Sequence, residues 1–206
     1  MLKKYEYKIL NLKSLKSKIG PFPRNKKVIM CHGVFDIVHP GHIRHLSYAK
    51  SKADILIASL TTDKHVKKGR YRPHVPENLR ALNLAAFDMV DFVYIDNEEK
   101  PLNTIKNIKP DYFAKGYEYD LSAKFRNEAT FEEENELKKY GGKIIFTPGD
   151  IVYSSTKILE STLPNLFLEK LTSSMENENL TFNDLRKSLE KISKLNVHVI
   201  GDTIID

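Results

Sequence analysis

The sequence predicts an α/β protein in which helices cover both faces of a parallel sheet, giving three layers. Short apolar runs of strand length alternate with segments of helical spacing over residues 27–165. Such continuous apolar runs are typical of strands that are buried on both faces. The polar segments that could hold a ligand all directly follow these runs. Because parallel sheets bind ligands beyond the carboxyl ends of their strands, the same pattern predicts one site at one edge.

The individual elements follow from local signals. The expected strands are residues 28–31, 54–60, 91–95, 112–115 and 143–147. The first expected helix begins near residue 41. The other expected helices cover residues 77–90, 102–108, 131–140 and 156–163. Pro110 ends the third of these helices, and Gly141 with Gly142 ends the fourth.

The chain divides into four parts. Residues 1–26 form a lead-in with a short helix that Gly20 and Pro21 end, and residues 27–165 form the α/β domain. Residues 166–195 form a polar linker and an amphipathic helix, a helical C-terminal extension of the fold. Residues 196–206 begin with a new apolar β-run that leads into Gly201 and Asp202, so we expect them to start a further domain.

Composition narrows the class of protein. The 206 residues carry a net charge of +6, and the basic residues are scattered beside acidic runs such as residues 132–134. This pattern favours small anionic substrates over nucleic acid. No apolar run reaches the ~20 residues that cross a bilayer, and the start lacks the apolar core of a signal peptide. With the single Cys31, these features predict a cytoplasmic protein without membrane partners.

The segment over residues 27–46 organises the candidate site. After the first strand, Gly33 frees the backbone, and Pro40 with Gly41 marks the turn into a helix. A helix N-terminus after such a loop suits a phosphate group. His39 and His42 flank the turn and can face that phosphate. Two other interpretations remain open: a pair of surface histidines, or a metal site with His45, although no Cys cluster and no close Asp or Glu completes such a site.

Several motifs carry a resemblance to a known family. Residues 39–42 (HPGH) resemble the His-x-Gly-His signature of the nucleotidyltransferase superfamily that includes cytidylyltransferases and adenylyltransferases. Residues 33–36 (GVFD) resemble the Gly-x-Phe-Asp run that precedes this signature. Residues 68–73 (KGRYRP) and 115–119 (KGYEY) are similar to segments of heptose-phosphate adenylyltransferases, and residues 154–158 (SSTKI) are similar to the family's last helix start.

The resemblance assigns roles to residues of this chain. The implied catalytic residues are His39, His42 and Lys68. The implied nucleotide-binding residues are Gly33, Val34, Phe35, Arg80, Lys115, Gly116, Ser154, Ser155 and Thr156. The implied residues for the acceptor substrate are Asp36, Asp63 and Arg72. No protein-bound metal is implied.

The resemblance also implies a Rossmann-like nucleotidyltransferase fold and an activity. The protein would transfer AMP or CMP from ATP or CTP to a sugar or polyol phosphate and release pyrophosphate, with Mg²⁺ bound to the nucleotide. A heptose-1-phosphate adenylyltransferase type, serving the synthesis of activated sugars for cell-surface glycans, fits best. The alternatives are a glycerol-3-phosphate cytidylyltransferase type and a non-catalytic nucleotide-binding regulatory domain.

Two further partners are expected. A homodimer is expected from the family. Residues 196–206 resemble the opening strand and Gly-Asp of a ribokinase-type sugar kinase, and heptose-type transferases are often fused to such kinases. We therefore expect a kinase domain covalently linked to the transferase in the full-length protein.

Overall fold

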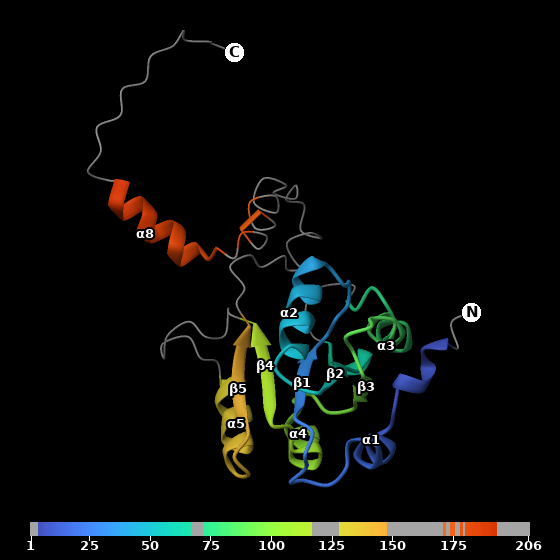
Figure 1. Cartoon of the computed structure of the whole chain (residues 1–206). Helices are drawn as coiled ribbons and strands as arrows, with labels where there is room; N and C mark the ends of the chain where they lie inside the picture. The colour runs from blue at the N-terminus through green and yellow to red at the C-terminus, as the bar shows by residue number, and fades with distance from the viewer. Residues whose placement is uncertain are drawn as a thin grey trace. The chain divides into compact units, whose positions relative to one another are not determined.

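Five parallel strands form one sheet, in the order β3-β2-β1-β4-β5 (Figure 1). The structure is a computed structural model and describes residues 4–66, 72–116, 128–147, 171, 174–175, 178 and 180–192. The strands are β1 (Val28–Gly33), β2 (Ile55–Thr61), β3 (Phe92–Asp96), β4 (Tyr112–Gly116) and β5 (Lys143–Thr147). All five predicted strands are present, each within two residues of its expected ends.

The helices of this sheet domain follow the predicted rhythm. They are α1 (Leu12–Ile19), α2 (Pro40–Lys50), α3 (Glu77–Ala85), α4 (Leu102–Ile108) and α5 (Glu128–Lys138), with 3₁₀ turns η2 (Glu6–Lys8) and η3 (Asp63–His65). Helix α3 ends five residues before the predicted end. After Ala85 turns replace the helix, since the amides of Phe87 and Val90 donate to carbonyls three residues back, at 3.2 Å each.

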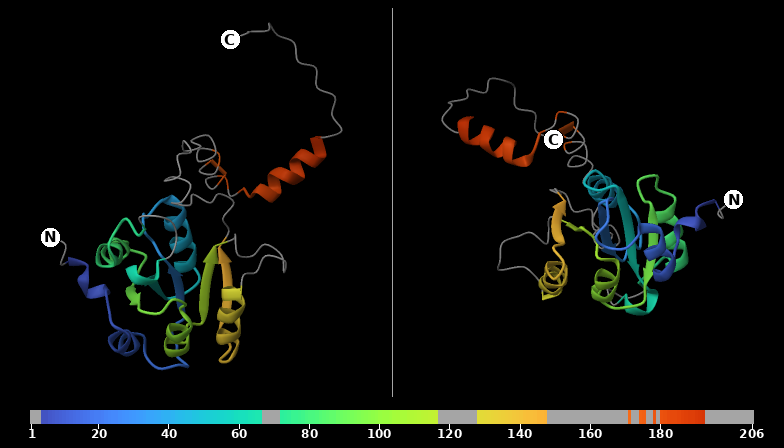
Figure 2. Two further views of the ribbon diagram at one scale, coloured as in Figure 1. Left: turned by 180° about the vertical axis from the view of Figure 1, so that it is seen from behind. Right: turned by 60° about the horizontal axis from the view of Figure 1, so that its bottom comes forward.

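Helices cover both faces of the sheet, as predicted (Figure 2). On one face Ile29 and Cys31 of β1 pack with buried residues of α2 and α3. On the other face Val28 and Met30 pack with α1, α4 and α5. Alternate residues of β1 therefore belong to two separate apolar cores, as required of a central strand that is buried on both sides.

Local signals set the helix ends. The Asn11 side chain accepts a hydrogen bond of 2.8 Å from the Ser14 amide and caps α1. Gly20 then ends α1 with a φ of 78°, a conformation that costs glycine little. Helix α4 ends at Lys109, which adopts the left-handed conformation just before Pro110.

The N-terminal lead-in lies along the outer edge of β3. Ile9 forms a parallel bridge with Val93, and the Leu10 amide donates to the Val93 carbonyl at 2.9 Å. The Lys8 ammonium donates to the Phe87 carbonyl at 3.0 Å. The lead-in therefore covers backbone groups that an exposed edge strand would present to other chains.

One expectation about the segment 77–90 is met only in part. Its helical spacing predicts an apolar face of Leu79, Leu82, Ala86 and Met89 or Val90. Val90 is buried and Leu82 is partly buried, but Leu79 and Ala86 are exposed. The buried residues of helix α3 are Arg80, Ala81, Leu84 and Ala85. Four hydrogen bonds hold the Arg80 side chain inside the protein, so its side of the helix faces the core.

By the contacts between its residues, the chain splits into two compact units, Met1–Thr162 and Leu163–Asp206. In the second unit α8 (Phe182–Ile192) lies within the predicted helix over residues 181–195. Its first turn is capped reciprocally: the Thr181 hydroxyl donates to the Asp184 carboxylate at 2.6 Å, and the Asp184 amide donates back at 3.2 Å. The expected helix over residues 156–163 and the expected strand over residues 197–200 lie outside the described residues.

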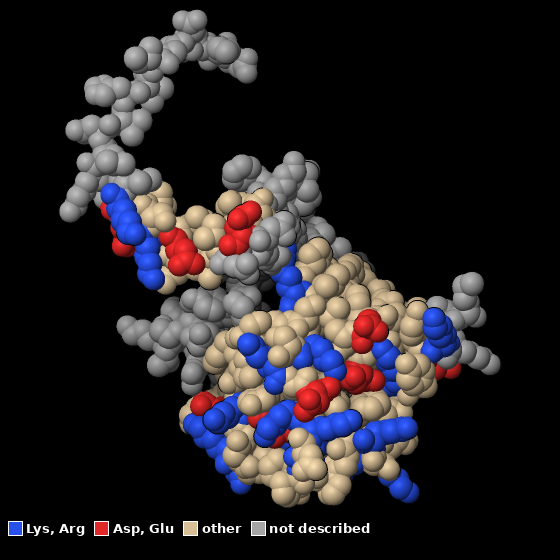
Figure 3. Space-filling model, viewed as in Figure 1, with Lys and Arg blue, Asp and Glu red and all other residues tan. Residues whose placement is uncertain are grey.

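Two surface properties bear on partners. On the face shown in Figure 3, Asp and Glu side chains are interspersed among the Lys and Arg side chains. Of the helices in the described ranges, none combines the length and apolar character needed to span a membrane.

Candidate active site

The order of the strands places a site beside β1. The chain moves from β1 outward to β2 and β3, and then returns to the other side of β1 to form β4 and β5. Cys31 of β1 pairs with Ala114 of β4, so the carboxyl ends of these two strands are neighbours. This reversal of strand order is where open α/β sheets bind ligands, and α2 follows directly from β1.

The N-terminus of α2 carries both predicted histidines. His39 is the N-cap residue but makes no side-chain capping bond, and Pro40 occupies the first turn. The rings of His39 and His42 lie 4.0 Å apart, centroid to centroid, at an angle of 34°. The two rings therefore lie side by side at the N-terminus of α2, and their contact with a phosphate stays a prediction.

Phe35 supports this pair. Its backbone has a φ of 49°, which a bulky residue rarely adopts, and only 4% of its surface is exposed. The Phe35 ring lies 5.2 Å from the His42 ring, and a Cβ on Gly33 would lie 3.4 Å from it. The loop after β1 therefore folds the Phe35 ring beneath His42, and Gly33 leaves room for it.

The environment keeps His42 neutral in the free protein. Burial, and then the nearby imidazoles of His39 and His45, lower the pKa of His42 from 6.5 to about 3. Its Nδ1 atom is buried and has no hydrogen-bond partner in the structure. A polyphosphate placed at this helix end would supply negative charge and raise that pKa again.

His45 joins α2 to the end of β5. Its Nδ1 atom lies 3.0 Å from the Thr147 Oγ1 atom, and the Thr147 hydroxyl donates to the Lys115 carbonyl at 3.2 Å. Because the single hydroxyl proton goes to that carbonyl, the His45 ring must donate from Nδ1. The contact ties the helix bearing the two histidines to the ends of β4 and β5.

Arg80 connects the loops after β1 and β2. It is fully buried, and its guanidinium donates to the carbonyls of Val34, Thr61 and Val75 and to the Asp63 carboxylate. The Asp36 carboxylate accepts hydrogen bonds from the His74 and Val75 amides. The structure thus brings together five of the predicted site residues, namely Val34, Phe35, Asp36, Asp63 and Arg80.

Lys115 is placed differently from these residues. Its ammonium pairs with the Glu133 carboxylate of α5, and both side chains are nearly buried. Because α5 covers the face opposite to α2, this ammonium lies on the other side of the sheet from the histidine pair. The Lys115 carbonyl, through Thr147, is the part of this residue that connects to His45.

The remaining predicted residues are only partly described. Gly116 ends β4, and Arg72 lies in the segment before α3. Lys68, Ser154, Ser155 and Thr156 lie outside the described residues. Their assigned roles stay predictions.

The sequence did not single out several residues that shape the site. His32, the residue before Gly33, lies between two hydroxyls: its Nδ1 atom is 3.0 Å from the Ser59 Oγ atom, and its Nε2 atom is 3.2 Å from the Thr61 Oγ1 atom. Burial, and then Lys115, lower the pKa of His32 from 6.5 to about 4. Glu77 and Thr147 were also missed. The position of His32 beside the motif glycine was a signal that could have found it. Glu77 and Thr147 are common surface residue types outside the motifs, so the sequence offered no signal for them.

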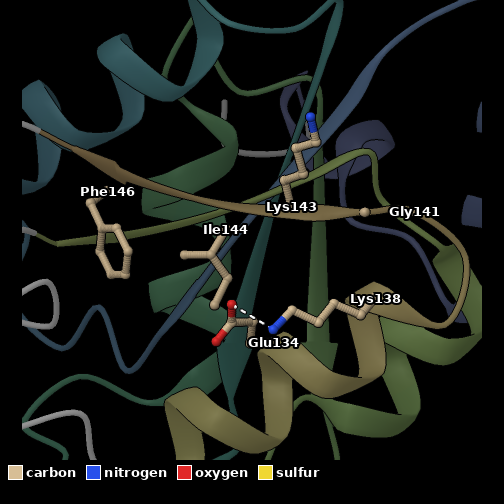
Figure 4. A pocket seen from close by; sticks show the side chains of 7 residues that line it. Glu134, Lys138, Gly141, Lys143, Ile144 and Phe146 are labelled. Atoms are coloured by element: carbon tan, nitrogen blue, oxygen red, sulfur yellow. Dashed lines mark ion pairs between the residues drawn. The ribbon is translucent and has the colours of Figure 1, made fainter. Parts of the chain in front are cut away.

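A separate pocket of about 470 Å³ lies between α5 and β5. Figure 4 shows Glu134 and Lys138 of α5 paired beside Ile144 of β5, and their ion pair measures 3.0 Å. Its lining includes Gly141 and Lys143 at the amino end of β5 but none of the predicted site residues. Across the described ranges no group of three His, Cys, Asp or Glu side chains could hold a metal ion.

A parallel sheet with a histidine pair at the helix that follows its central strand defines a nucleotidyltransferase-type α/β domain. Residues 30–161 match the family model described as cytidylyltransferase-like. This chain belongs to the cytidylyltransferase-like family, and it is an enzyme of the nucleotidyltransferase type, as its sequence predicts.

The chain is similar to bifunctional HldE proteins from several bacteria. The chain is 50% identical over 97 residues to the bifunctional protein HldE of Campylobacter jejuni, which covers 46% of this chain and 21% of that protein. It is 32% identical over 142 residues to HldE of Geobacter sulfurreducens. That alignment covers 68% of this chain and 28% of that protein. This chain therefore matches only 21% and 28% of the length of these two relatives.

Solved structures agree on the fold. The chain is similar to a lipopolysaccharide core biosynthesis protein from Thermoplasma volcanium, with a TM-score of 0.52 and 26% identity. That match covers 62% of this chain and all of the other. A pantoate-beta-alanine ligase from Francisella tularensis matches with a TM-score of 0.53 over 78% of this chain and 76% of that one, at 15% identity, and shows the fold alone.

Proposed function

We propose that this protein transfers AMP from ATP to a sugar 1-phosphate of the heptose type and releases pyrophosphate. The observation that carries the proposal is the pair of stacked histidines at the N-terminus of α2, beside the reversal of strand order. The similarity to HldE proteins over 97 residues and more supports the heptose-type acceptor.

The chemistry needs charge stabilisation more than covalent participation. An oxygen of the acceptor phosphate attacks the α-phosphorus of the nucleotide, and the bond between that phosphorus and the bridging oxygen to the β-phosphate breaks. Negative charge develops on the α-phosphate oxygens and on the departing pyrophosphate. His39 and His42 would donate hydrogen bonds to these oxygens, together with backbone N–H groups at the start of α2.

Other residues would complete the site. Lys68 would stabilise the transferring phosphates, and the Ser154–Thr156 segment would bind the β- and γ-phosphates. Mg²⁺ would enter with the nucleotide as part of the substrate. We further propose that the protein acts as a homodimer in the cytoplasm and that a sugar kinase domain, covalently linked in the full-length protein, supplies the acceptor.

The decisive experiment measures pyrophosphate release with ATP and with CTP over a panel of sugar and polyol phosphates. We expect ATP with a heptose 1-phosphate to be the fastest pair, with activity lost in EDTA and restored by Mg²⁺. Preference for CTP with glycerol 3-phosphate would replace the heptose assignment. Nucleotide binding without turnover for any acceptor would favour a regulatory nucleotide-binding domain.

A further inference from the structure

The guanidinium of Arg80 already has protein acceptors on three sides. Nε donates to the Val75 carbonyl at 2.9 Å, Nη1 donates to the Val34 carbonyl, and Nη2 donates to the Thr61 carbonyl at 2.8 Å. Nη2 also donates to the Asp63 carboxylate at 2.6 Å. An arginine has five N–H donors, and four are used here. With no surface exposed, this side chain is poorly placed to bind a nucleotide directly.

The acceptors of Arg80 come from three separate segments. Val34 lies in the loop after β1, Thr61 and Asp63 lie at the end of β2, and Val75 lies in the turn before α3. A planar guanidinium donates in fixed directions, so it can hold the three segments in one arrangement relative to one another. A lysine ammonium cannot reproduce this arrangement. Arg80 is therefore the common attachment point of these loops.

Carboxylates fasten the same segments a second time. The Asp63 amide donates to Glu77 Oε2 at 2.7 Å, and the Glu77 amide donates to Asp63 Oδ2 at 3.2 Å. Asp36 is 2% exposed, and its Oδ1 atom accepts from the His74 amide at 2.8 Å and the Val75 amide at 3.0 Å. We call Arg80, Asp63, Glu77 and Asp36 the loop clamp.

The loop clamp acts on the site through Val34 and Phe35. Arg80 donates to the Val34 carbonyl, and the next residue is Phe35. The Phe35 backbone is left-handed, and its ring lies 5.2 Å from the His42 ring. A strained conformation of this kind persists only when the surrounding contacts hold it.

We propose that Arg80 is a positioning residue that fixes the Phe35 turn, and with it His42, without touching the nucleotide. The activity consequence rests on the proposed transferase function. The faster hydrogen exchange expected in the loops does not rest on that function, because it is measured in the protein without nucleotide.

The test compares Arg80→Lys and Arg80→Gln with Arg186→Gln, the same change at an exposed arginine of α8. Hydrogen exchange is measured by mass spectrometry without nucleotide. We expect exchange of peptides covering residues 33–38 and 72–78 to accelerate at least tenfold in both Arg80 variants. Peptides from β4 and β5 should stay within twofold, and Arg186→Gln should match the wild type throughout.

Kinetics supply a second, independent readout. In Arg80→Lys we expect kcat to fall at least tenfold while the KM and the Kd for ATP stay within about twofold. Unchanged exchange in the free protein together with a raised Kd for ATP would overturn the proposal and make Arg80 a ligand of the nucleotide. A uniform rise of exchange over the whole sheet would also overturn it.

Asp63→Ala keeps the test decisive if the Arg80 variants do not fold. It removes only one acceptor of the guanidinium, and the Asp63 side chain is 40% exposed. Exchange in residues 33–38 should rise in Asp63→Ala and rise less in Asp63→Asn, whose carbonyl still accepts from Arg80 although its amide nitrogen cannot accept from the Glu77 amide. Equal exchange in Asp63→Ala and the wild type would contradict the clamp even without measurable transferase activity.

Discussion

The imidazole of His45 and the hydroxyl of Thr147 lie 3.0 Å apart and join the helix of the histidine pair to the last strand of the sheet. Thr147→Val removes the acceptor of the ring and the donor to the Lys115 carbonyl. We expect a loss of ~1–3 kcal/mol in the free energy of unfolding, since two partly buried groups each lose a partner. Urea unfolding measures it. Thr147→Ser, which keeps the hydroxyl, should lose less than half as much; equal losses would refute the bond's contribution.

The histidine pair should dominate turnover. His39→Ala and His42→Ala each remove one donor to the developing phosphate charge, and removal of such a donor typically costs ~3 kcal/mol of transition-state stabilisation. We expect kcat in the pyrophosphate-release assay to fall by a factor of roughly 10²–10³. Circular dichroism melting should show that both variants fold. Activity within a few-fold of the wild type for both would contradict the proposed role.

The buried Phe35 ring offers a matched pair of substitutions. Phe35→Leu removes the ring beneath His42, and we expect a loss of about 1–2 kcal/mol in stability together with a lower kcat. Phe131→Leu makes the same change on the exposed surface of α5, where 58% of the side chain is accessible. Its effect on stability should stay within ~0.5 kcal/mol. Similar losses in both variants would show that the Phe35 site is not specifically packed.

The pair of Lys115 and Glu133 separates a structural role from nucleotide binding. Glu133→Ala leaves an almost buried ammonium without its carboxylate and should cost ~3–5 kcal/mol of stability. The double variant Lys115→Met with Glu133→Leu should recover most of that loss. If the double variant also raises the KM for the nucleotide more than fivefold, the predicted nucleotide contact of Lys115 is supported. An unchanged KM would contradict the predicted nucleotide contact of Lys115.

Stability should fall as the solution is acidified below about pH 6.5. The pKa of His32 is about 4 in the folded protein, against 6.5 for an ordinary histidine. Between these values the unfolded chain binds more protons at this position, so stability rises with pH through that window and is lost on acidification. We expect the urea midpoint of the wild type to drop between pH 7 and pH 5.

The variant His32→Gln should show a smaller drop, because it removes the group that resists protonation when folded. His74→Gln alters an exposed imidazole and should behave like the wild type. A drop of the same size in His32→Gln and the wild type would exclude His32 as a source of the pH dependence.

Sequence patterns predicted the fold well because they report burial directly. The run from Val28 to Cys31 is apolar at every position, and the structure buries all four residues. The turn with His39 and His42 could be predicted equally well, since Pro40 and Gly41 mark a helix start. These features depend on neighbours in the sequence.

The environments of Arg80 and Lys115 could not be predicted from the sequence in the same way. An arginine on a helix is normally assigned to the exposed face. The acceptors that hold Arg80 inside include the carbonyls of Val34 and Thr61, which precede it by 46 and 19 residues. Lys115 finds its partner in a helix that begins beyond the next loop. Roles that depend on contacts between distant segments require the three-dimensional structure.

The lead-in along β3 sets an order of events during synthesis. Lys8 donates to the carbonyl of Phe87, which follows it by 79 residues, and Ile9 pairs with Val93. A ribosome that adds ~5–20 residues per second needs roughly 4–16 s to make that intervening stretch. For that time the first-made segment has no place to dock. The end of the chain that is made first can therefore join the sheet only after β3 has been made, and only β4 and β5 of the sheet are made later.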